Sequence, residues 1–275
     1  MTLPTFLGIG VPRAGTTWLH TLLSGNPEVC LPTQRKEIRF FDRYYERGLD
    51  WYESFFCSPE EAPAYGAIGE ISPQYVYCEA TPGRISAALP EVKLLIMLRH
   101  PVDRAYSQFG FVAQRRNYGG SFEDFLATRP NALEYGFYGH YLKRYLRFFD
   151  RSRILPLLFE EVMADKRMAS ERLAAFLGLS VDGFPSSVER VNPSTVPRFP
   201  ALSSVAVRAG RTLRRSHLEG VVDLGARFGG RRLLTSGKRV EPLSADKRRT
   251  LTRRYASDFE DLEECLQIDV SLWRR

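Results

Sequence analysis

No apolar run in this 275-residue sequence approaches the roughly 18 residues that a membrane-spanning helix needs. The first residues, MTLPTFLGIG, lead directly into an apolar segment and lack the basic region and cleavage site of a secretory signal. These absences predict a cytoplasmic protein without a transmembrane segment.

Cysteine and histidine are scarce, with four residues of each type. The cysteines, which lack the close spacing of metal-ligand pairs, are Cys30, Cys57, Cys78 and Cys265. A cytosolic protein keeps its thiols reduced, so free thiols are expected. The sequence therefore predicts neither a disulfide framework nor a metal site.

The net charge of +7 comes from one late part of the chain, because residues 205–254 hold 14 Lys and Arg against four acidic residues. No nucleic-acid-binding module is recognisable there, so a nucleic-acid partner is not expected. Residues 205–240 also contain glycines. We interpret this segment as a mobile basic insertion beside an acceptor site. The insertion would attract an anionic acceptor or a lipid headgroup, whereas a solvated helix face is the plainer alternative.

The segment Phe6–Leu23, FLGIGVPRAGTTWLHTLL, dominates the rest of the sequence. An apolar strand pattern leads into a Gly, Pro and Arg turn, and a helical pattern follows, which is how a chain presents backbone N–H groups to a phosphate. Gly10 and Gly15 have the spacing of the P-loop pattern GxxxxGK[ST], but Thr16 occupies the lysine position. A nucleotide hydrolase would lack a phosphate ligand there, whereas Arg13 offers a cation from elsewhere in the loop. A tight turn without a ligand is the alternative.

Short apolar strands alternate with helical patterns along the chain. The expected strands are the run from Phe6, Val29–Leu31, Ala67–Glu70, Lys93–Leu98 and Ile154–Phe159. This order predicts an α/β fold, namely a P-loop-like single domain over residues 1–275 with a central parallel sheet of about five strands and helices on both faces. Such a sheet gathers ligands at the carboxyl ends of its strands.

Polar residues follow two of these strands. Arg99 and Ser107 flank the start of a helix after Lys93–Leu98 and suit a second phosphate group, with an Arg99–Asp103 pair as the alternative. Glu37 follows the second strand, in the segment KEIRFFDRYYERGLDWYESFF, whose dense aromatics and charges show no clear period. We interpret this segment as a loop lining a cleft, although Glu37 could instead pair with Lys36 or Arg39 at the surface.

The motifs PRAGTTWL and LRHPVDRAYSQF together resemble those of sulfotransferases that use 3'-phosphoadenosine 5'-phosphosulfate. The segment from Lys36 is further similar to heparan sulfate N-sulfotransferase and 3-O-sulfotransferase domains, with a bacterial member as the nearest type. The resemblance implies that the first loop holds the phosphosulfate, that Arg99 and Ser107 bind the 3'-phosphate, and that Glu37 is the catalytic base. Arg13 stands where the family usually has lysine, and Arg198 is the candidate for its cofactor-closing basic loop.

The predicted function is sulfuryl transfer from this donor to a hydroxyl or amine of a carbohydrate or small molecule. Arg13 and Glu37 would be catalytic, and no metal is required. The expected donor-binding residues are Arg13, Ala14, Gly15, Thr16, Thr17, Trp18, Arg99, Ser107 and Arg198. The expected acceptor-binding residues are Lys36, Phe40, Phe41, Glu70 and Tyr75. Two alternatives remain open, a P-loop-type kinase or nucleotidase and a non-catalytic nucleotide-regulated binding protein.

Overall fold

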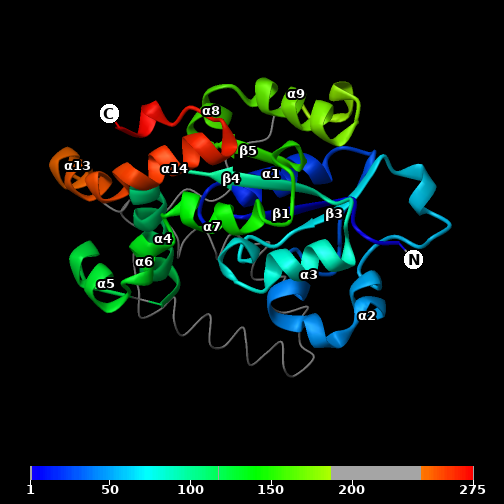
Figure 1. The fold of residues 1–275 in the computed structure, drawn as a ribbon, viewed down its shortest axis with the longest axis horizontal. Helices are drawn as coiled ribbons and strands as arrows, with labels where there is room; N and C mark the ends of the chain where they lie inside the picture. Colours follow the sequence, from blue (N-terminus) through cyan, green and yellow to red (C-terminus); the bar gives the residue numbers. More distant parts are fainter. Residues whose placement is uncertain (1, 117, 187–242, 275) are drawn as a thin grey trace, which may run out of the picture. The chain divides into compact units, whose positions relative to one another are not determined.

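The computed structural model describes residues 2–116, 118–186 and 243–274 (Figure 1). These residues form two compact units. The first unit holds the described residues up to Arg104, those from Tyr135 to the long gap, and those from Arg249 onward. The second holds the described residues of Ala105–Glu134 and those just before Arg249. Arg198 and the basic insertion expected at 205–240 lie outside the described residues.

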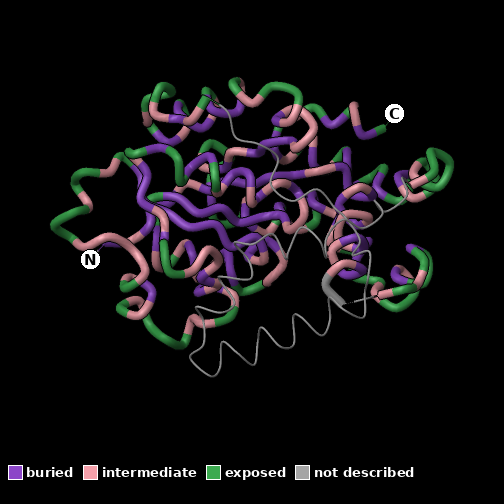
Figure 2. The backbone as a smooth tube through the Cα atoms, turned by 180° about the vertical axis from the view of Figure 1, so that it is seen from behind, coloured by how far each residue is buried: buried purple, intermediate pink, exposed green. Residues whose placement is uncertain are grey.

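The first unit is built around a five-stranded, wholly parallel sheet with the strand order β2-β3-β1-β4-β5. The strands are β1 (Phe6–Gly10), β2 (Val29–Cys30), β3 (Ala67–Ile71), β4 (Lys93–Leu98) and β5 (Ile154–Leu158). They form as strands because short apolar runs suit a sheet that is covered on both faces. Figure 2 shows them as a mostly buried layer. The predicted fold class and strand number are confirmed.

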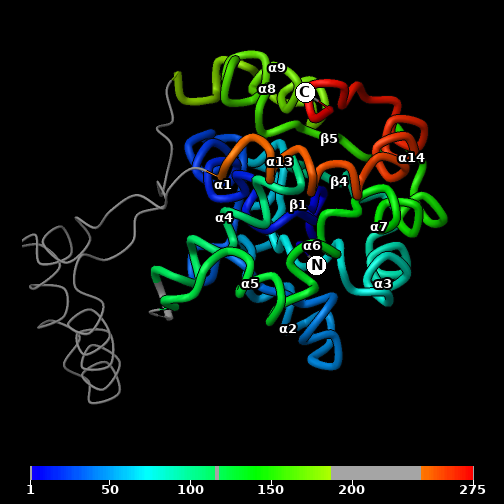
Figure 3. Tube along the Cα trace, turned by 90° about the vertical axis from the view of Figure 1, so that its left-hand side faces the viewer, coloured from blue at the N-terminus to red at the C-terminus, as the bar shows by residue number. Residues whose placement is uncertain are grey.

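Helices cover both faces of this sheet, with α1 on one face and α3, α7 and α14 on the other (Figure 3). The helices of the first unit include α1 (Thr16–Ser24), α2 (Leu49–Glu53), α3 (Thr81–Ala88), α7 (Tyr138–Tyr145), α8 (Phe159–Ala164), α9 (Lys166–Leu177) and α14 (Ala256–Leu266). Gly178 ends α9 in the left-handed conformation, with φ 80°, as expected for a C-terminal glycine. The sheet is therefore doubly wound.

The second unit contains α5 (Phe122–Thr128) and α6 (Asn131–Glu134), together with most of α4 (Pro101–Arg116) and the first half of α13 (Ala245–Thr252). Its aromatic side chains pack on one another, with the ring centroids of Phe109 and Phe125 5.6 Å apart. Ser121 and Asp124 form a reciprocal capping box that starts α5. The prediction of a single domain over the whole chain stays a prediction.

Three elements have details that local patterns do not specify. Helix α4 begins at Pro101, because proline suits the first helical position. A 3₁₀ turn at Arg253–Tyr255 separates α13 from α14. The aromatic segment expected as a loop contains a π-helical turn, Phe40–Tyr44, and α2.

Candidate functional site

The loop between β1 and α1 contains two residues with left-handed backbone conformations. Arg13 has φ 74° and Gly15 has φ 94°, both in the left-handed region. A Cβ on Gly15 would lie 2.8 Å from a ring carbon of Phe159, so the position requires glycine. Left-handed conformations of non-glycine residues such as Arg13 are uncommon and cluster at ligand sites.

The first turn of α1 presents the donors that an anion needs. Helix geometry leaves the N–H groups of Thr16, Thr17 and Trp18 without partners inside the helix. The side chains of Thr16 and Trp18 are 7% and 3% exposed, so these two residues can offer a ligand mainly their backbone N–H. Ala14 is buried and supports the loop from below. The strand, loop and helix predicted here are confirmed, and donor binding by these residues stays a prediction.

Arg99 lies one residue past β4 and contacts the first loop. Its Nη1 donates to the Arg13 carbonyl oxygen at 3.3 Å, and its guanidinium carbon lies 4.7 Å from the centroid of the Phe159 ring. Arg13 and Arg99, the two cationic residues predicted to bind the donor, are therefore linked by a hydrogen bond at the carboxyl edge of the sheet. Ser107 lies on α4 in the second unit, so its role beside Arg99 stays a prediction.

The backbone around Arg99 is fixed by residues that sequence reasoning missed. The Tyr138 hydroxyl donates to the Arg99 carbonyl oxygen at 2.7 Å, and Glu160 Oε1 accepts from the His100 N–H at 2.9 Å. Glu160 Oε2 accepts from the indole N–H of Trp273 at 3.1 Å. Trp273 has no exposed surface. The C-terminal segment therefore packs against the residues that hold the second predicted phosphate loop in place.

Glu37 is half-buried and makes no hydrogen bond or ion pair within the described part of the chain. Both neighbouring cations are engaged elsewhere. The Lys36 ammonium donates to Thr17 Oγ1 at 2.9 Å, and Arg39 Nε donates to Asp42 Oδ2 at 3.0 Å. The described residues therefore contain no ion pair of Glu37 with Lys36 or Arg39, which was the alternative interpretation of Glu37. Its role as the base stays a prediction.

The backbone next to Glu37 is held by the end of β3. The Ile38 N–H donates to Glu70 Oε2 at 3.2 Å, and the Arg39 N–H donates to Ser72 Oγ at 3.0 Å. Ser72 Oγ donates in turn to Glu70 Oε2 at 2.6 Å. The segment that carries Glu37 is thus attached to the same sheet edge as the first loop and Arg99.

Glu70 is completely buried and accepts four hydrogen bonds. Besides Ile38 and Ser72, the donors are the hydroxyls of Tyr75 at 2.6 Å and Tyr52 at 2.8 Å. Burial raises the pKa of Glu70, while the hydroxyl donors oppose that shift. This arrangement fits a structural anchor for the Glu37 segment.

The side chains of Phe40, Phe41, Glu70 and Tyr75 are each at most 1% exposed. Phe40 stacks on Tyr52 with ring centroids 4.4 Å apart, in the core under the segment. The structure therefore departs from the prediction that these four side chains contact an acceptor, because a fully buried side chain cannot reach one in this conformation. The aromatic rings among these residues form a local core.

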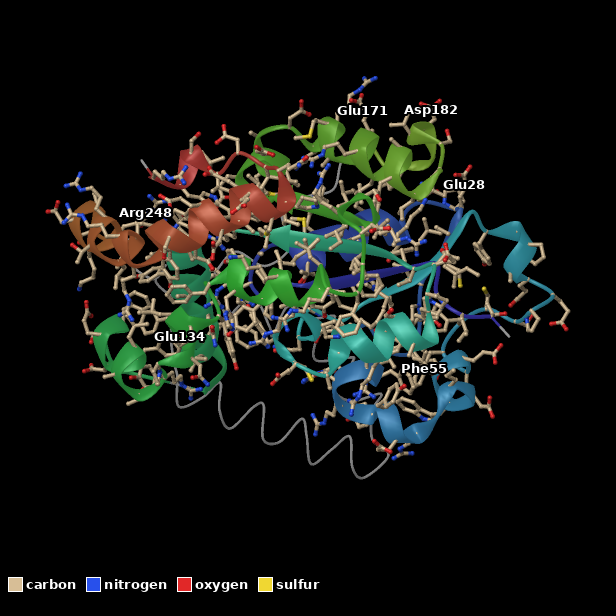
Figure 4. The ribbon with its side chains drawn as sticks, viewed as in Figure 1. Glu28, Phe55, Glu134, Glu171, Asp182 and Arg248 are labelled. Atoms are coloured by element: carbon tan, nitrogen blue, oxygen red, sulfur yellow. The ribbon has the colours of Figure 1, made fainter. Side chains whose placement is uncertain are left out.

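Other side chains of the same segment do reach its surface. Trp51 packs edge-on against Phe55, which is labelled in Figure 4, with ring centroids 4.9 Å apart. Exposed Arg43 and Arg47 lie near the rings of Tyr44 and Trp51, at 5.4 and 5.6 Å from the respective centroids. The surface of the segment that contains Glu37 therefore combines cations with aromatic rings.

Ser72→Ala should lower the free energy of unfolding by roughly 1–3 kcal/mol, since it leaves the Arg39 N–H without its acceptor. It should also reduce turnover while leaving nucleotide affinity unchanged, because the Glu37 segment loses an anchor and the first loop does not. Urea unfolding and nucleotide titration would measure both effects. Ser54→Ala, at an exposed position of the same segment, is the control. Equal stability of the two variants would show that Ser72 is no anchor.

In the described ranges, no helix has the length and apolar character of a membrane span. The same ranges contain no group of three His, Cys, Asp or Glu side chains that could hold a metal ion.

Comparison with known proteins identifies a family. A family profile described as "Sulfotransferase domain" matches residues 3–197, which is more than half of the chain. The human bifunctional heparan sulfate N-deacetylase/N-sulfotransferase 2 is 31% identical over 200 residues, which cover 65% of this chain and 22% of the relative. The human heparan sulfate glucosamine 3-O-sulfotransferase 6 is 32% identical over 184 residues, which cover 64% of this chain and 52% of the relative.

A solved structure also matches over its full length. The sulfotransferase from Alicyclobacillus acidocaldarius superposes with a TM-score of 0.72, at 26% identity, and the match covers 100% of both chains. The similarity therefore includes the C-terminal segment that packs behind Arg99, which lies beyond the family match at residue 197.

Proposed function

The chain belongs to the sulfotransferase domain family, and we propose that it transfers a sulfuryl group from 3'-phosphoadenosine 5'-phosphosulfate to a hydroxyl or amine of an acceptor. The observation that carries the proposal is the hydrogen bond from Arg99 to the Arg13 carbonyl, because it joins the two loops that are proposed to bind anions. A donor with phosphate groups at both ends of its ribose needs two such loops, and a simple hydrolase of nucleoside triphosphates does not.

The open turn of α1 fits the 5'-phosphosulfate, since backbone N–H groups and the helix dipole favour an anion there. Arg13 would place its guanidinium against the same group and stabilise charge on the bridging oxygen. Arg99 would bind the 3'-phosphate, with the Phe159 ring supporting its guanidinium. Ser107 and Arg198 remain proposed donor ligands from the family resemblance.

In the proposed reaction, the acceptor oxygen or nitrogen forms a bond to sulfur while the bond from sulfur to the phosphate oxygen breaks. Glu37 takes the acceptor proton, and adenosine 3',5'-bisphosphate leaves with the bonding electron pair. That leaving group is stable as an anion, so the mechanism needs positioning and charge stabilisation rather than a protein acid. No metal ion enters this scheme.

The acceptor class is proposed from the relatives and from the exposed surface of the segment that contains Glu37. The relatives named above are heparan sulfate enzymes, whose names point to saccharide acceptors. Exposed Arg43 and Arg47, each beside an aromatic ring, suit a saccharide or small molecule that carries negative charge. The sequence supports two further proposals, a lipid-linked acceptor and a cytoplasmic location.

Adenosine 3',5'-bisphosphate should raise the melting temperature of the protein without magnesium, whereas AMP at the same concentration should have little effect. The reason is that the proposed pocket has separate sites for two phosphate groups. A thermal-shift series with both nucleotides and with Mg-ATP would measure this preference. Stabilisation by Mg-ATP alone would instead favour the kinase or nucleotidase alternative.

A further inference from the structure

The loop between β1 and α1 lacks the lysine of the P-loop pattern, because Thr16 stands in its place. The Thr16 side chain is buried and neutral, so it cannot supply the missing charge. Arg13 is the cation that the loop itself contains. A second cation nevertheless reaches the same helix terminus from a different part of the chain.

That cation is Lys36, which lies 19 positions after Thr17 in the sequence and follows β2. Its ammonium donates to Thr17 Oγ1 at 2.9 Å. Thr17 is the second residue of α1, in the turn whose backbone N–H groups are open. The carboxyl end of β2 therefore brings a positive charge to the anion-binding end of α1.

Lys36 is half-buried, so its ammonium is only partly solvated. Burial lowers the pKa of its ammonium, and the neighbouring Glu37 carboxylate opposes that shift. His20, on the next turn of α1, has its pKa lowered by burial and by the charge of Lys36. The charge interaction with His20 is a second indication that the Lys36 ammonium lies against α1.

We propose that Lys36 is a catalytic residue on the donor side of the site, where it replaces the absent P-loop lysine. The inference rests on the proposed sulfotransferase function and adds a second cation, besides Arg13, to the phosphosulfate site. The ammonium exchanges its hydrogen bond with Thr17 for oxygens of the phosphosulfate, and it stabilises the charge that develops on the oxygen between phosphorus and sulfur. This role differs from the acceptor contact that the sequence predicts for Lys36.

The position next to Glu37 gives this assignment a chemical consequence. Lys36 would provide the cation for the leaving group, and Glu37, the next residue, would provide the base for the incoming group. Both residues would be aligned by the same attachment of Ile38 and Arg39 to the end of β3. Binding of the donor would thereby fix the position of the base.

Titration with adenosine 3',5'-bisphosphate tests the donor-side role without requiring the acceptor. Lys36→Gln should weaken its binding by about tenfold, because one charge-assisted hydrogen bond is lost. Lys36→Arg should retain most of the affinity. Lys143→Gln, which removes an exposed ammonium paired with Asp261 on the surface, should bind like the unmodified protein.

The outcomes separate this inference from the proposed function. If the unmodified protein binds the nucleotide and Lys36→Gln binds it equally well, Lys36 does not contact the donor. If the unmodified protein itself does not bind the nucleotide, the proposed function fails, and the role of Lys36 fails with it. Release of labelled sulfate from the donor, with water as the acceptor, gives a second readout and should also fall in Lys36→Gln.

Discussion

Replacing Glu37 with glutamine should reduce turnover by roughly 10²- to 10⁴-fold and leave the affinity for adenosine 3',5'-bisphosphate unchanged. The amide has nearly the same shape but cannot accept the proton of the acceptor. Nucleotide binding should persist because the contacts proposed for the nucleotide come from the first loop, Lys36 and Arg99. Steady-state kinetics and isothermal titration would measure the two effects separately.

The matched control for this variant is Glu46→Gln, which changes an exposed carboxylate of the same segment. It should leave turnover unchanged. Near-normal turnover of Glu37→Gln with the true acceptor would remove Glu37 as the base. The other candidates are then His20 and Glu70, although Glu70 has no exposed surface in this conformation.

Arg99→Ala should remove the preference for 3'-phosphorylated nucleotides, with a loss of affinity for adenosine 3',5'-bisphosphate on the order of 100-fold. A guanidinium that binds a phosphate through two hydrogen bonds contributes more than a single lysine contact. Affinity for AMP should change little, because AMP lacks the phosphate that Arg99 is proposed to bind. The ratio of the two dissociation constants is therefore the informative quantity.

A matched control is Arg147→Ala, at an exposed position after α7. It should leave the ratio of dissociation constants as it is in the unmodified protein. An Arg99→Ala protein that still prefers the 3'-phosphorylated nucleotide would place the 3'-phosphate elsewhere. An equal loss of affinity for both nucleotides would show that Arg99 supports the first loop through the Arg13 carbonyl instead.

The parts that sequence predicts well are those set by local patterns. The apolar run Lys93–Leu98 becomes β4 with the same bounds, because a short apolar run flanked by turns suits a buried strand. The turn before α1 follows equally directly from Gly10, Arg13 and Gly15. Local sequence fixes which residues follow each strand, and the parallel sheet then brings these residues to one edge.

The parts that sequence does not predict depend on contacts between distant segments. Nothing near Thr17 indicates that Lys36 will donate to it, and nothing near Arg99 indicates a link through Glu160 to Trp273. The burial of Phe40 was also missed. A dense aromatic segment without a period is compatible with a cleft lining or with a small core, and only tertiary packing decides between them.

The central claim is that this site moves a sulfuryl group, and the most direct measurement follows that group. The protein should be incubated with sulfur-labelled 3'-phosphoadenosine 5'-phosphosulfate and an extract of its source cells. The account predicts a new labelled product, with one adenosine 3',5'-bisphosphate released for each label transferred and with strong reduction in Glu37→Gln. If the unmodified protein produces no labelled product, or if Glu37→Gln produces as much of it, the result would contradict the account.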